Sequence, residues 1–241
     1  MDSRTAVVVG AGPGTGAEIA RLLAREGFAL VLARRDADAL APLVADIEAA
    51  GGKALAVAAD AAEEQDVAHL LDQAQTRFGA PELVIYNAGG ITMGGVADTG
   101  LDQLEAMWRA SARGGFLVGR EAARRMIDWG RGTIVFTGAT ASVKGAADFS
   151  AFAAGKHGLR AIAQSMAREL GPRGIHVAHL IIDGIIDVPR VHERMPEVTA
   201  AKGADGLIDP RSVAATMLWL HRQPRDAWTF ELDLRPFKEP W

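Results

Sequence analysis

The sequence contains no cysteine, and only one of its 241 residues is a tyrosine. Without cysteine the chain forms no disulfide, no thiolate metal site and no cysteine nucleophile, and it needs no oxidising compartment. No apolar run approaches the ~18 residues of a membrane-spanning helix, and a strand-like run begins by Thr5, which leaves no room for a signal peptide. We therefore predict a cytoplasmic protein without a membrane partner.

Positive charge is also scarce. The 26 Lys and Arg residues are outnumbered by 30 Asp and Glu, which gives a net charge of −4, the wrong sign for a general nucleic-acid binder. His176 and His179 share one predicted strand at a spacing that points them to opposite faces, and the other histidines are scattered. We expect no metal site and no nucleic-acid partner, but a small-molecule ligand.

Short apolar runs alternate with stretches of helical periodicity along the chain. The predicted strands are 5–10, 28–33, 54–59, 82–86, 134–137, 175–182 and 228–232, and the predicted helices are 14–26, 36–50, 63–78, 101–129, 155–170 and 210–221. Strands that are apolar on both faces and separated by helices predict a parallel sheet covered on both sides. We therefore predict an α/β protein, one domain over residues 1–241 with a doubly wound, Rossmann-like parallel sheet. The least regular segment, 183–209, exceeds ordinary loop lengths, and we interpret it as a lid over a substrate.

Four glycines mark the turn between the first predicted strand and the first predicted helix: Gly10, Gly12, Gly14 and Gly16. Glycine lets the backbone approach a pyrophosphate closely, and the following helix offers its N-terminal dipole to that group. In this strand–turn–helix context the pattern favours a nucleotide site over a purely structural tight turn.

The spacing Gly10-x3-Gly14-x-Gly16 resembles that of short-chain dehydrogenases/reductases, and the similarity extends along almost the whole chain. Three further matches to this family are Asn87-Ala88-Gly89 after the fourth strand, Asp60 after the third, and Lys156 in a later helix.

The resemblance implies a nicotinamide dinucleotide cofactor. Asp60 then contacts the adenine, Asn87 to Gly89 lie beside the cofactor, and Gly184 and Ile185 offer their backbone to the nicotinamide carboxamide. It also implies a homodimer or homotetramer built through helices 101–129 and 155–170.

The end of the second strand indicates which dinucleotide is preferred. An NAD-binding relative carries an acid there for the ribose 2′-hydroxyl, but this chain has Arg34 and Arg35. Two guanidinium groups suit a 2′-phosphate, so we predict NADP(H) over NAD(H). The alternative is a solvated basic pair, and Asp36 either caps the next helix or softens the preference.

The family's catalytic residues are largely missing. The resemblance places Phe152 at the position of the proton-donating Tyr, Ala139 at that of the Ser, and Ser111 at that of the Asn, so that only Lys156 is kept. In this exchange the chain resembles a divergent subgroup of the family that has Phe in place of the Tyr and keeps the Lys. Phenylalanine has no proton to give. Lys156 can still bind the nicotinamide ribose, and the alternative is a surface lysine on an amphipathic helix.

Asp183 is a candidate replacement acid or base if its carboxylate lies beside Lys156; the alternative is a helix-cap or loop carboxylate that faces water. Residues predicted to line an apolar substrate pocket are Phe149, Phe152, Ile186, Val191 and Met195.

Three functions remain open. The first is an NADP(H)-dependent oxidoreductase with an incomplete catalytic set. The second is a non-catalytic dinucleotide-binding protein, and the third is a non-redox enzyme on the same fold.

Overall fold

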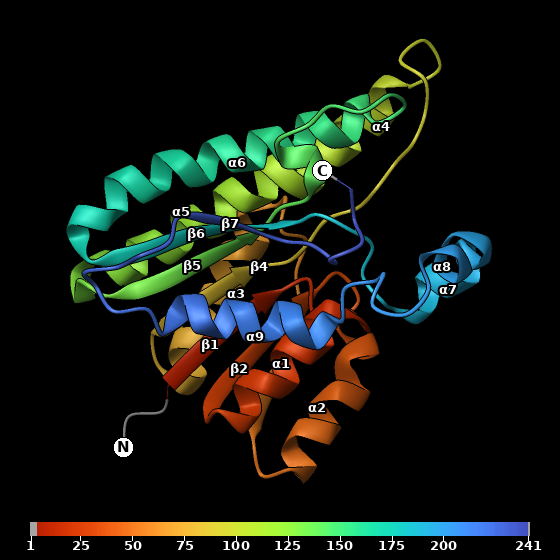
Figure 1. The fold of residues 1–241 in the computed structure, drawn as a ribbon. Helices are drawn as coiled ribbons and strands as arrows, with labels where there is room; N and C mark the ends of the chain where they lie inside the picture. The colour runs from red at the N-terminus through yellow and green to blue at the C-terminus, as the bar shows by residue number, and fades with distance from the viewer. Residues whose placement is uncertain (1–3, 241) are drawn as a thin grey trace.

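The seven strands all pair in parallel, in the order β3-β2-β1-β4-β5-β6-β7. This computed structural model describes residues 4–240 (Figure 1). The strands are β1 (Arg4–Val9), β2 (Phe28–Arg34), β3 (Lys53–Ala58), β4 (Pro81–Tyr86), β5 (Gly132–Thr137), β6 (Ile175–Ile182) and β7 (Glu231–Leu234). The strand order reverses between β1 and β4, so the carboxyl ends of these two strands border the crevice where such sheets bind ligands. The predicted doubly wound parallel sheet is confirmed.

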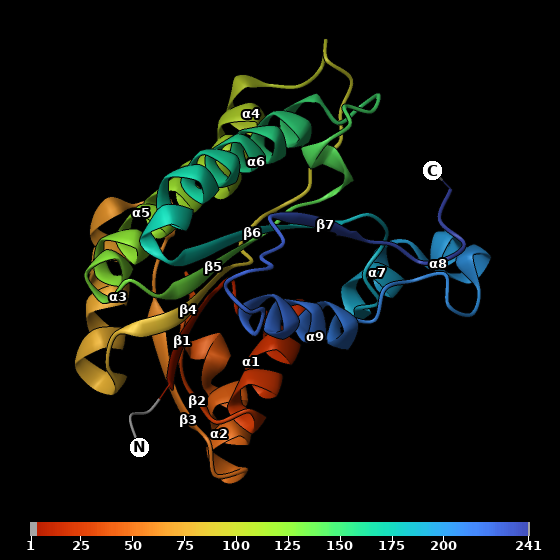
Figure 2. The same cartoon turned by 60° about the vertical axis from the view of Figure 1, so that its left-hand side comes forward.

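Helices cover both faces of the sheet, as Figure 2 shows from the side. One face carries α1 (Thr15–Arg25), α2 (Ala41–Ala49) and α9 (Pro210–His221); the other carries α3 (Glu64–Phe78), α4 (Leu101–Trp108), α5 (Gly114–Met126) and α6 (Ser150–Leu170). Alternate residues of β1 feed the two cores: Ala6 and Val8 pack on the first side, Val7 and Val9 on the second. This two-residue period makes each strand read as a continuous apolar run.

The stretch 101–129, predicted as one helix, is divided in the structure. It comprises α4, a π-helical turn over Arg109–Arg113, α5 and a short 3-10 turn over Ile127–Trp129. A π turn inserts an extra residue into the helical repeat and often marks a functional position. Ser111 lies in this turn and is fully buried.

The segment 183–209 is more regular than predicted. It contains α7 (Pro189–Arg194) and α8 (Pro196–Lys202), each opened by a proline, whose fixed φ suits the first turn of a helix. A β-bridge between Ile186 and Ile208 closes the base of the segment. We call residues 183–209 the lid segment.

The chain beyond β7 is fastened to the lid segment. Arg235 forms an ion pair with Asp183, and Lys202 forms one with Glu239. Lys238 Nζ donates to the carbonyl of Ala204 at 2.7 Å. Residues 235–240, which we call the tail, therefore contact the lid segment at both its base and its far end (Figure 2).

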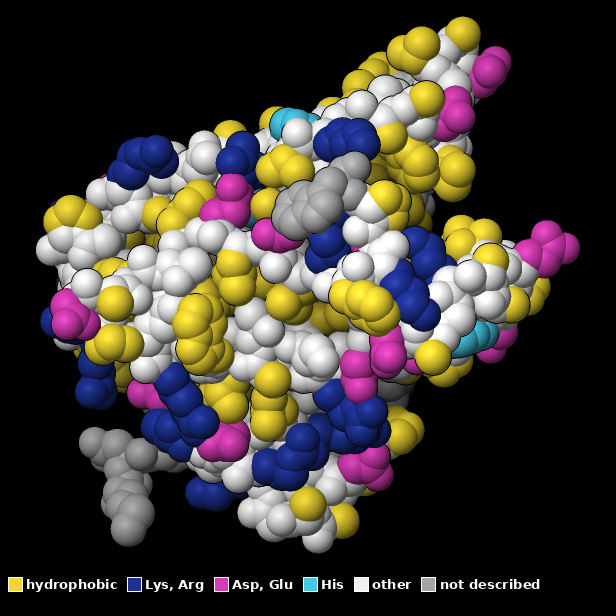
Figure 3. All heavy atoms as spheres, viewed as in Figure 1, with side chains coloured by type: hydrophobic (Ala, Val, Ile, Leu, Met, Phe, Trp, Pro, Cys, Tyr) yellow, Lys and Arg dark blue, Asp and Glu magenta, His cyan; other side chains and the backbone are white. Residues whose placement is uncertain are grey.

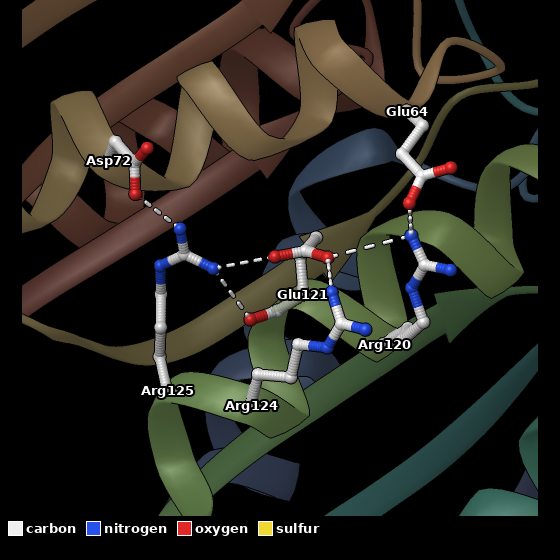
Figure 4. A network of polar contacts seen from close by, with 6 residues as sticks. All are labelled: Glu64, Asp72, Arg120, Glu121, Arg124 and Arg125. Carbon is white, nitrogen blue, oxygen red and sulfur yellow. Dashed lines mark hydrogen bonds and ion pairs between the residues drawn. The ribbon is translucent and has the colours of Figure 1, made fainter.

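Helices α3 and α5 are joined by a charged cluster around Glu121 (Figure 4). The side chain of Glu121 is only 7% exposed and pairs with Arg124 at 2.6 Å and Arg125 at 2.9 Å. Arg125 also pairs with Asp72 on α3. The buried carboxylate is thereby surrounded by guanidinium groups that reach across to the neighbouring helix.

Within residues 4–240, no helix has the length and apolar character needed to cross a bilayer. The same residues contain no group of three or more His, Asp or Glu side chains arranged to hold a metal ion.

Candidate functional site

The glycine turn leaves one position open and closes the others. Gly10 has φ +86°, and a Cβ there would lie 2.6 Å from the backbone nitrogen of Ala88. A Cβ on Gly16 would lie 2.4 Å from the carbonyl oxygen of Gly10, whereas one on Gly12 would meet nothing within 4 Å. Backbone packing therefore requires glycine at two positions, while Gly12 faces open space in front of α1, whose N-cap Gly14 has no side-chain cap. This is the shape of an anion cradle at a helix N-terminus.

Asn87 ties this turn to the neighbouring strands. Its backbone N–H donates to Val9 at 2.8 Å, and its side-chain Nδ2 donates to the carbonyl of Gly10 at 3.2 Å. Its Oδ1 accepts from the Thr137 hydroxyl at 3.1 Å, across β5. Asn87 thus fixes the glycine turn relative to the ends of β4 and β5.

Arg34 and Arg35 lie directly beyond the point where the turn is anchored to β2. The carbonyl of Ala33 accepts from the backbone N–H groups of Gly10 at 2.8 Å and Ala11 at 3.2 Å. Neither Arg34 nor Arg35 forms a side-chain ion pair or hydrogen bond with the described part of the chain. Two unpaired guanidinium groups therefore stand beside the cradle.

Two acids near this end have local structural partners. Asp36 accepts from the backbone N–H of Ala39 at 3.4 Å, in keeping with the capping alternative. Asp60 follows β3, and its carboxylate accepts from the backbone of Ala62 at 2.9 Å, while its own N–H donates to Asp66. Asp60 is therefore oriented by the turn that leads into α3.

Phe152, at the position that the resemblance assigns to a proton-donating tyrosine, forms an aromatic pair with Phe149. The rings of Phe149 and Phe152 lie 6.4 Å apart between centroids, at the start of α6. Ala139 follows β5 and begins a short 3-10 turn over Thr140–Ser142, where its N–H donates to the Ser142 hydroxyl at 3.1 Å. The buried Ser111 hydroxyl has no hydrogen-bond partner among the described residues.

Lys156 points into the protein, which excludes the surface-lysine alternative. It is 6% exposed, and Nζ donates to the carbonyl of Thr137 at 2.9 Å. On its other side, a Cβ placed on Gly89 would lie 3.4 Å from Nζ. The ammonium group therefore sits between the carboxyl ends of β4 and β5. Burial lowers the pKa of Lys156 to about 8, because a poorly solvated site disfavours the charged form.

Asp183 does not lie against Lys156 as the acid–base hypothesis requires. Its carboxylate accepts from the Thr140 hydroxyl at 2.7 Å and forms an ion pair with Arg235. Of the described carboxylates, none forms an ion pair with Lys156. The expectation of an exposed loop carboxylate is also corrected, because the side chain is only 16% exposed.

Behind this site lies a buried group that the sequence analysis did not identify. His179 on β6 is fully buried, with Nδ1 2.9 Å from Glu231 on β7. Glu231 is also held by Arg160 on α6 through two bonds of 2.7 Å. Burial lowers the pKa of His179 to about 4, whereas hydrogen bonding to Arg160 lowers the pKa of Glu231. Glu231 comes 52 residues after His179 and 71 residues after Arg160, so no local sequence pattern connects the three residues.

The lid segment adjoins the cradle. A Cβ on Gly14 would lie 3.0 Å from Val188, so the base of the lid segment borders the glycine turn. Gly184 is packed against Pro236 of the tail, and the carbonyl of Ile185 accepts from Ile208.

Figure 3 shows the surface notched between the arm that carries the loop before α4 and the lobe formed by α7 and α8. Among the apolar candidates, Phe149 and Phe152 contact each other, Ile186 is in the lid bridge, and Val191 and Met195 lie on or just after α7. Exposed apolar residues on the arm and the lobe are Ile91, Met93, Val96, Met195 and Val198.

Comparison with known proteins identifies clear relatives. A sequence profile of the family described as short chain dehydrogenase matches residues 4–198. A short-chain dehydrogenase structure from Rhodopseudomonas palustris is 43% identical, with a TM-score of 0.83 and coverage of 97% of this chain and 99% of that one. A metagenomic short-chain oxidoreductase in complex with NADP is 27% identical, with a TM-score of 0.82 and 97% coverage of both chains. The versicolorin reductase of Emericella nidulans is 33% identical over 178 residues, 73% of this chain and 67% of the relative.

Proposed function

The chain belongs to the short-chain dehydrogenase family, an oxidoreductase family, and on that premise we propose that it is an NADP(H)-dependent reductase of small apolar carbonyl compounds. The open space at Gly12 in front of α1 fits a dinucleotide diphosphate. A bound reduced nicotinamide supplies the hydride, and the protein supplies binding, orientation and the proton.

The proposed cofactor contacts are those that the family resemblance assigns. Gly10, Gly12, Gly14 and Gly16 would hold the diphosphate, and Asp60 would contact the adenine. Asn87, Ala88 and Gly89 together with Lys156 would hold the nicotinamide ribose, and the backbone of Gly184 and Ile185 would bind the carboxamide.

The observation that carries the NADP(H) preference is the pair of unpaired guanidinium groups of Arg34 and Arg35. Charge-assisted bonds to a 2′-phosphate contribute about 1.5 to 3 kcal/mol, which is roughly a tenfold to 150-fold ratio of dissociation constants. Fluorescence titration of the purified protein should therefore give tighter binding of NADPH than of NADH. The Arg34→Asp variant should reverse this order.

Arg173→Asp is the matched control, because Arg173 is an exposed arginine near the opposite end of β6 and the exchange changes net charge equally. It should leave the NADPH-to-NADH ratio unchanged. Equal or tighter NADH binding by the wild type contradicts the proposed preference.

The vacant catalytic positions give a second test of the reductase. The double variant Ala139→Ser plus Phe152→Tyr adds a hydroxyl after β5 and a phenol on α6. The phenol lies one helical turn before Lys156. Positioned acid catalysis typically contributes 10²- to 10⁴-fold, so NADPH oxidation with a panel of aldehydes and ketones should rise above a low wild-type rate. Fast wild-type turnover that the double variant does not change would place the proton donor elsewhere.

A second candidate is a non-catalytic dinucleotide-binding protein, and the natural residues at these two positions favour it. Phe152 and Ala139 carry no exchangeable side-chain proton, while the cofactor cradle is intact. This candidate moves ahead of the reductase if both the wild type and the double variant bind NADPH and neither oxidises it.

We also propose that the chain forms a homo-oligomer through α4, α5 and α6. Large apolar side chains on the outer surface of α4 and α5 support this, since Leu101 is 68% exposed, Trp108 48% and Phe116 43%, and such exposed groups are unusual on monomers when they form a patch. Light scattering after size exclusion should give a dimer or tetramer mass, and Trp108→Glu should lower it. A monomeric wild type contradicts the proposal.

A further inference from the structure

We propose that the ammonium group of Lys156 is the proton donor to the substrate oxygen, replacing the phenol that this chain lacks. The inference rests on the proposed reductase function and assigns the acid for that reaction. It follows from which proton-bearing groups near the site are already committed to other partners.

The hydroxyl groups of Thr137, Thr140 and Tyr86 already donate elsewhere. Thr137 donates to Asn87 at 3.1 Å, and Thr140 donates to Asp183 at 2.7 Å. The one tyrosine of the sequence, Tyr86, is fully buried and donates to the carbonyl of Ala110 at 2.8 Å. Each of these protons is therefore already held by an acceptor within the protein.

The two remaining candidates fit less well than a cation. Asp183 acts as an acceptor, because Thr140 and Arg235 both donate to its carboxylate. Ser111 is fully buried in the π turn, and a neutral serine hydroxyl holds its proton too strongly to match neutral pH.

Lys156 meets the requirements of a general acid. Its ammonium carries three N–H donors, and the described residues accept one of them, at the carbonyl of Thr137. Phe152, the residue at the phenol position, stands one helical turn earlier on the same face of α6, and Nζ reaches the gap between Thr137 and Gly89. Burial brings the pKa of Lys156 to about 8, close to the pH at which an acid both holds and releases its proton.

The charged groups around Lys156 do not supply a carboxylate partner. His179 on β6 faces it and is kept neutral by burial, which lowers the pKa of His179 to about 4. Glu231 on β7 is held by Arg160 and His179. Among residues 4–240, the acceptor that holds the protonated form of Lys156 is the neutral carbonyl of Thr137.

The proposed step balances simply. A bound reduced dinucleotide would supply hydride to the carbonyl carbon. As the C=O π pair moves to oxygen, an N–H bond of Lys156 would break and an O–H bond would form. The products are the alcohol, the oxidised dinucleotide and a neutral amine, which takes up a proton from solvent before the next turnover.

The first test measures the protonation state directly. The chain has five lysines, so a protein labelled with ¹³C-lysine gives few Cε resonances, and Lys156→Arg assigns one of them. That resonance should titrate near pH 8, both alone and with NADPH bound. Lys144, exposed in the loop after β5, is the internal reference, and its resonance should not change near pH 8 together with that of Lys156. A Lys156 resonance that titrates above pH 10 overturns the proposal.

The second test measures the rate of NADPH oxidation with a panel of aromatic ketones and quinones between pH 6 and pH 10. For the wild type, kcat/KM should fall tenfold per unit above pH 8. Lys156→Arg keeps the charge but does not deprotonate in this range, so it should lose 10²- to 10⁴-fold in kcat while the Kd for NADPH changes only a few-fold. Lys144→Arg should behave as the wild type.

The outcomes separate the two proposals. If carbonyls are reduced without a fall above pH 8, or if Lys156→Arg keeps more than a tenth of kcat, the donor assignment is wrong and the reductase stands. If NADPH binds but no member of the panel is reduced, the reductase and the donor assignment both fail.

Discussion

Glu121 offers the most direct test of what holds the helices beside the site in place. The change Glu121→Gln removes the charge of a carboxylate that is only 7% exposed and pairs with Arg124 and Arg125 (Figure 4). It keeps the size and one acceptor oxygen of the side chain. The expected loss is therefore electrostatic rather than a packing defect.

The structure sets the size of this loss. Removing one partner of a buried ion pair costs about 3 to 5 kcal/mol. Arg120 and Arg125 keep second partners in Glu64 and Asp72, and the Arg124 side chain is 60% exposed and can be rehydrated. We therefore expect the lower end, about 3 kcal/mol in the free energy of unfolding. For a chain of this length that corresponds to roughly 6 to 12 °C in Tm.

Urea unfolding followed by circular dichroism measures the difference, with Glu64→Gln as the control. Glu64 also pairs with Arg120, but its side chain is 63% exposed, and a surface ion pair contributes no more than about 1 kcal/mol. If Glu121→Gln destabilises the protein no more than Glu64→Gln does, burial of the carboxylate does not decide the strength of the cluster, and the reasoning is refuted.

Three further predictions concern pH, the lid segment and the cradle. The folded protein holds the pKa of His179 at about 4, below the ordinary 6.5 of the unfolded chain. The contribution of neutral His179 to the free energy of unfolding is therefore fully present above pH 6.5 and is lost as pH falls toward 4. His179→Gln should flatten the unfolding free energy against pH in that window, and an unchanged slope would contradict the assignment. Glu239→Gln removes the ion pair of the tail with Lys202, so limited trypsin digestion should cut after Lys202 several-fold faster, and an unchanged rate would show that the tail does not restrain the lid segment. Gly12→Ala should fold as the wild type, since a Cβ there meets nothing within 4 Å, yet weaken NADPH binding at least tenfold in a fluorescence titration; unchanged affinity would mean that the diphosphate lies elsewhere.

Local sequence patterns predicted the sheet well because each strand is buried on both faces. The apolar run of β2 is visible without knowing any neighbour, since all its residues from Phe28 to Ala33 are buried. The glycine turn is equally local: Gly10 has a left-handed φ of +86° and touches the backbone after β4. Such features depend on residue type at one place in the chain.

The parts that sequence did not predict depend on partners far along the chain. Asp183 was a candidate acid or base on the condition that it lay beside Lys156, with a carboxylate facing water as the alternative. Its partner Arg235 lies 52 residues further on, and a periodicity argument cannot identify it. The same limit applies to His179, whose partner Glu231 comes from another strand. In the lid segment, short helices that begin with Pro189 and Pro196 have too few turns to produce a clear apolar period.

The last strand has a further consequence for how molecules of this protein meet. β7 is the outer strand of the sheet beside β6 and is only four residues long, and outer strands expose unpaired backbone groups that can template aggregation. Glu231 and Asp233 place charges along it, and Pro236, which has no backbone N–H, follows it closely. We therefore expect the strand that carries a partner for His179 also to hinder pairing of the sheet with a neighbouring molecule, and neutral apolar substitutions at Asp233 to weaken that protection.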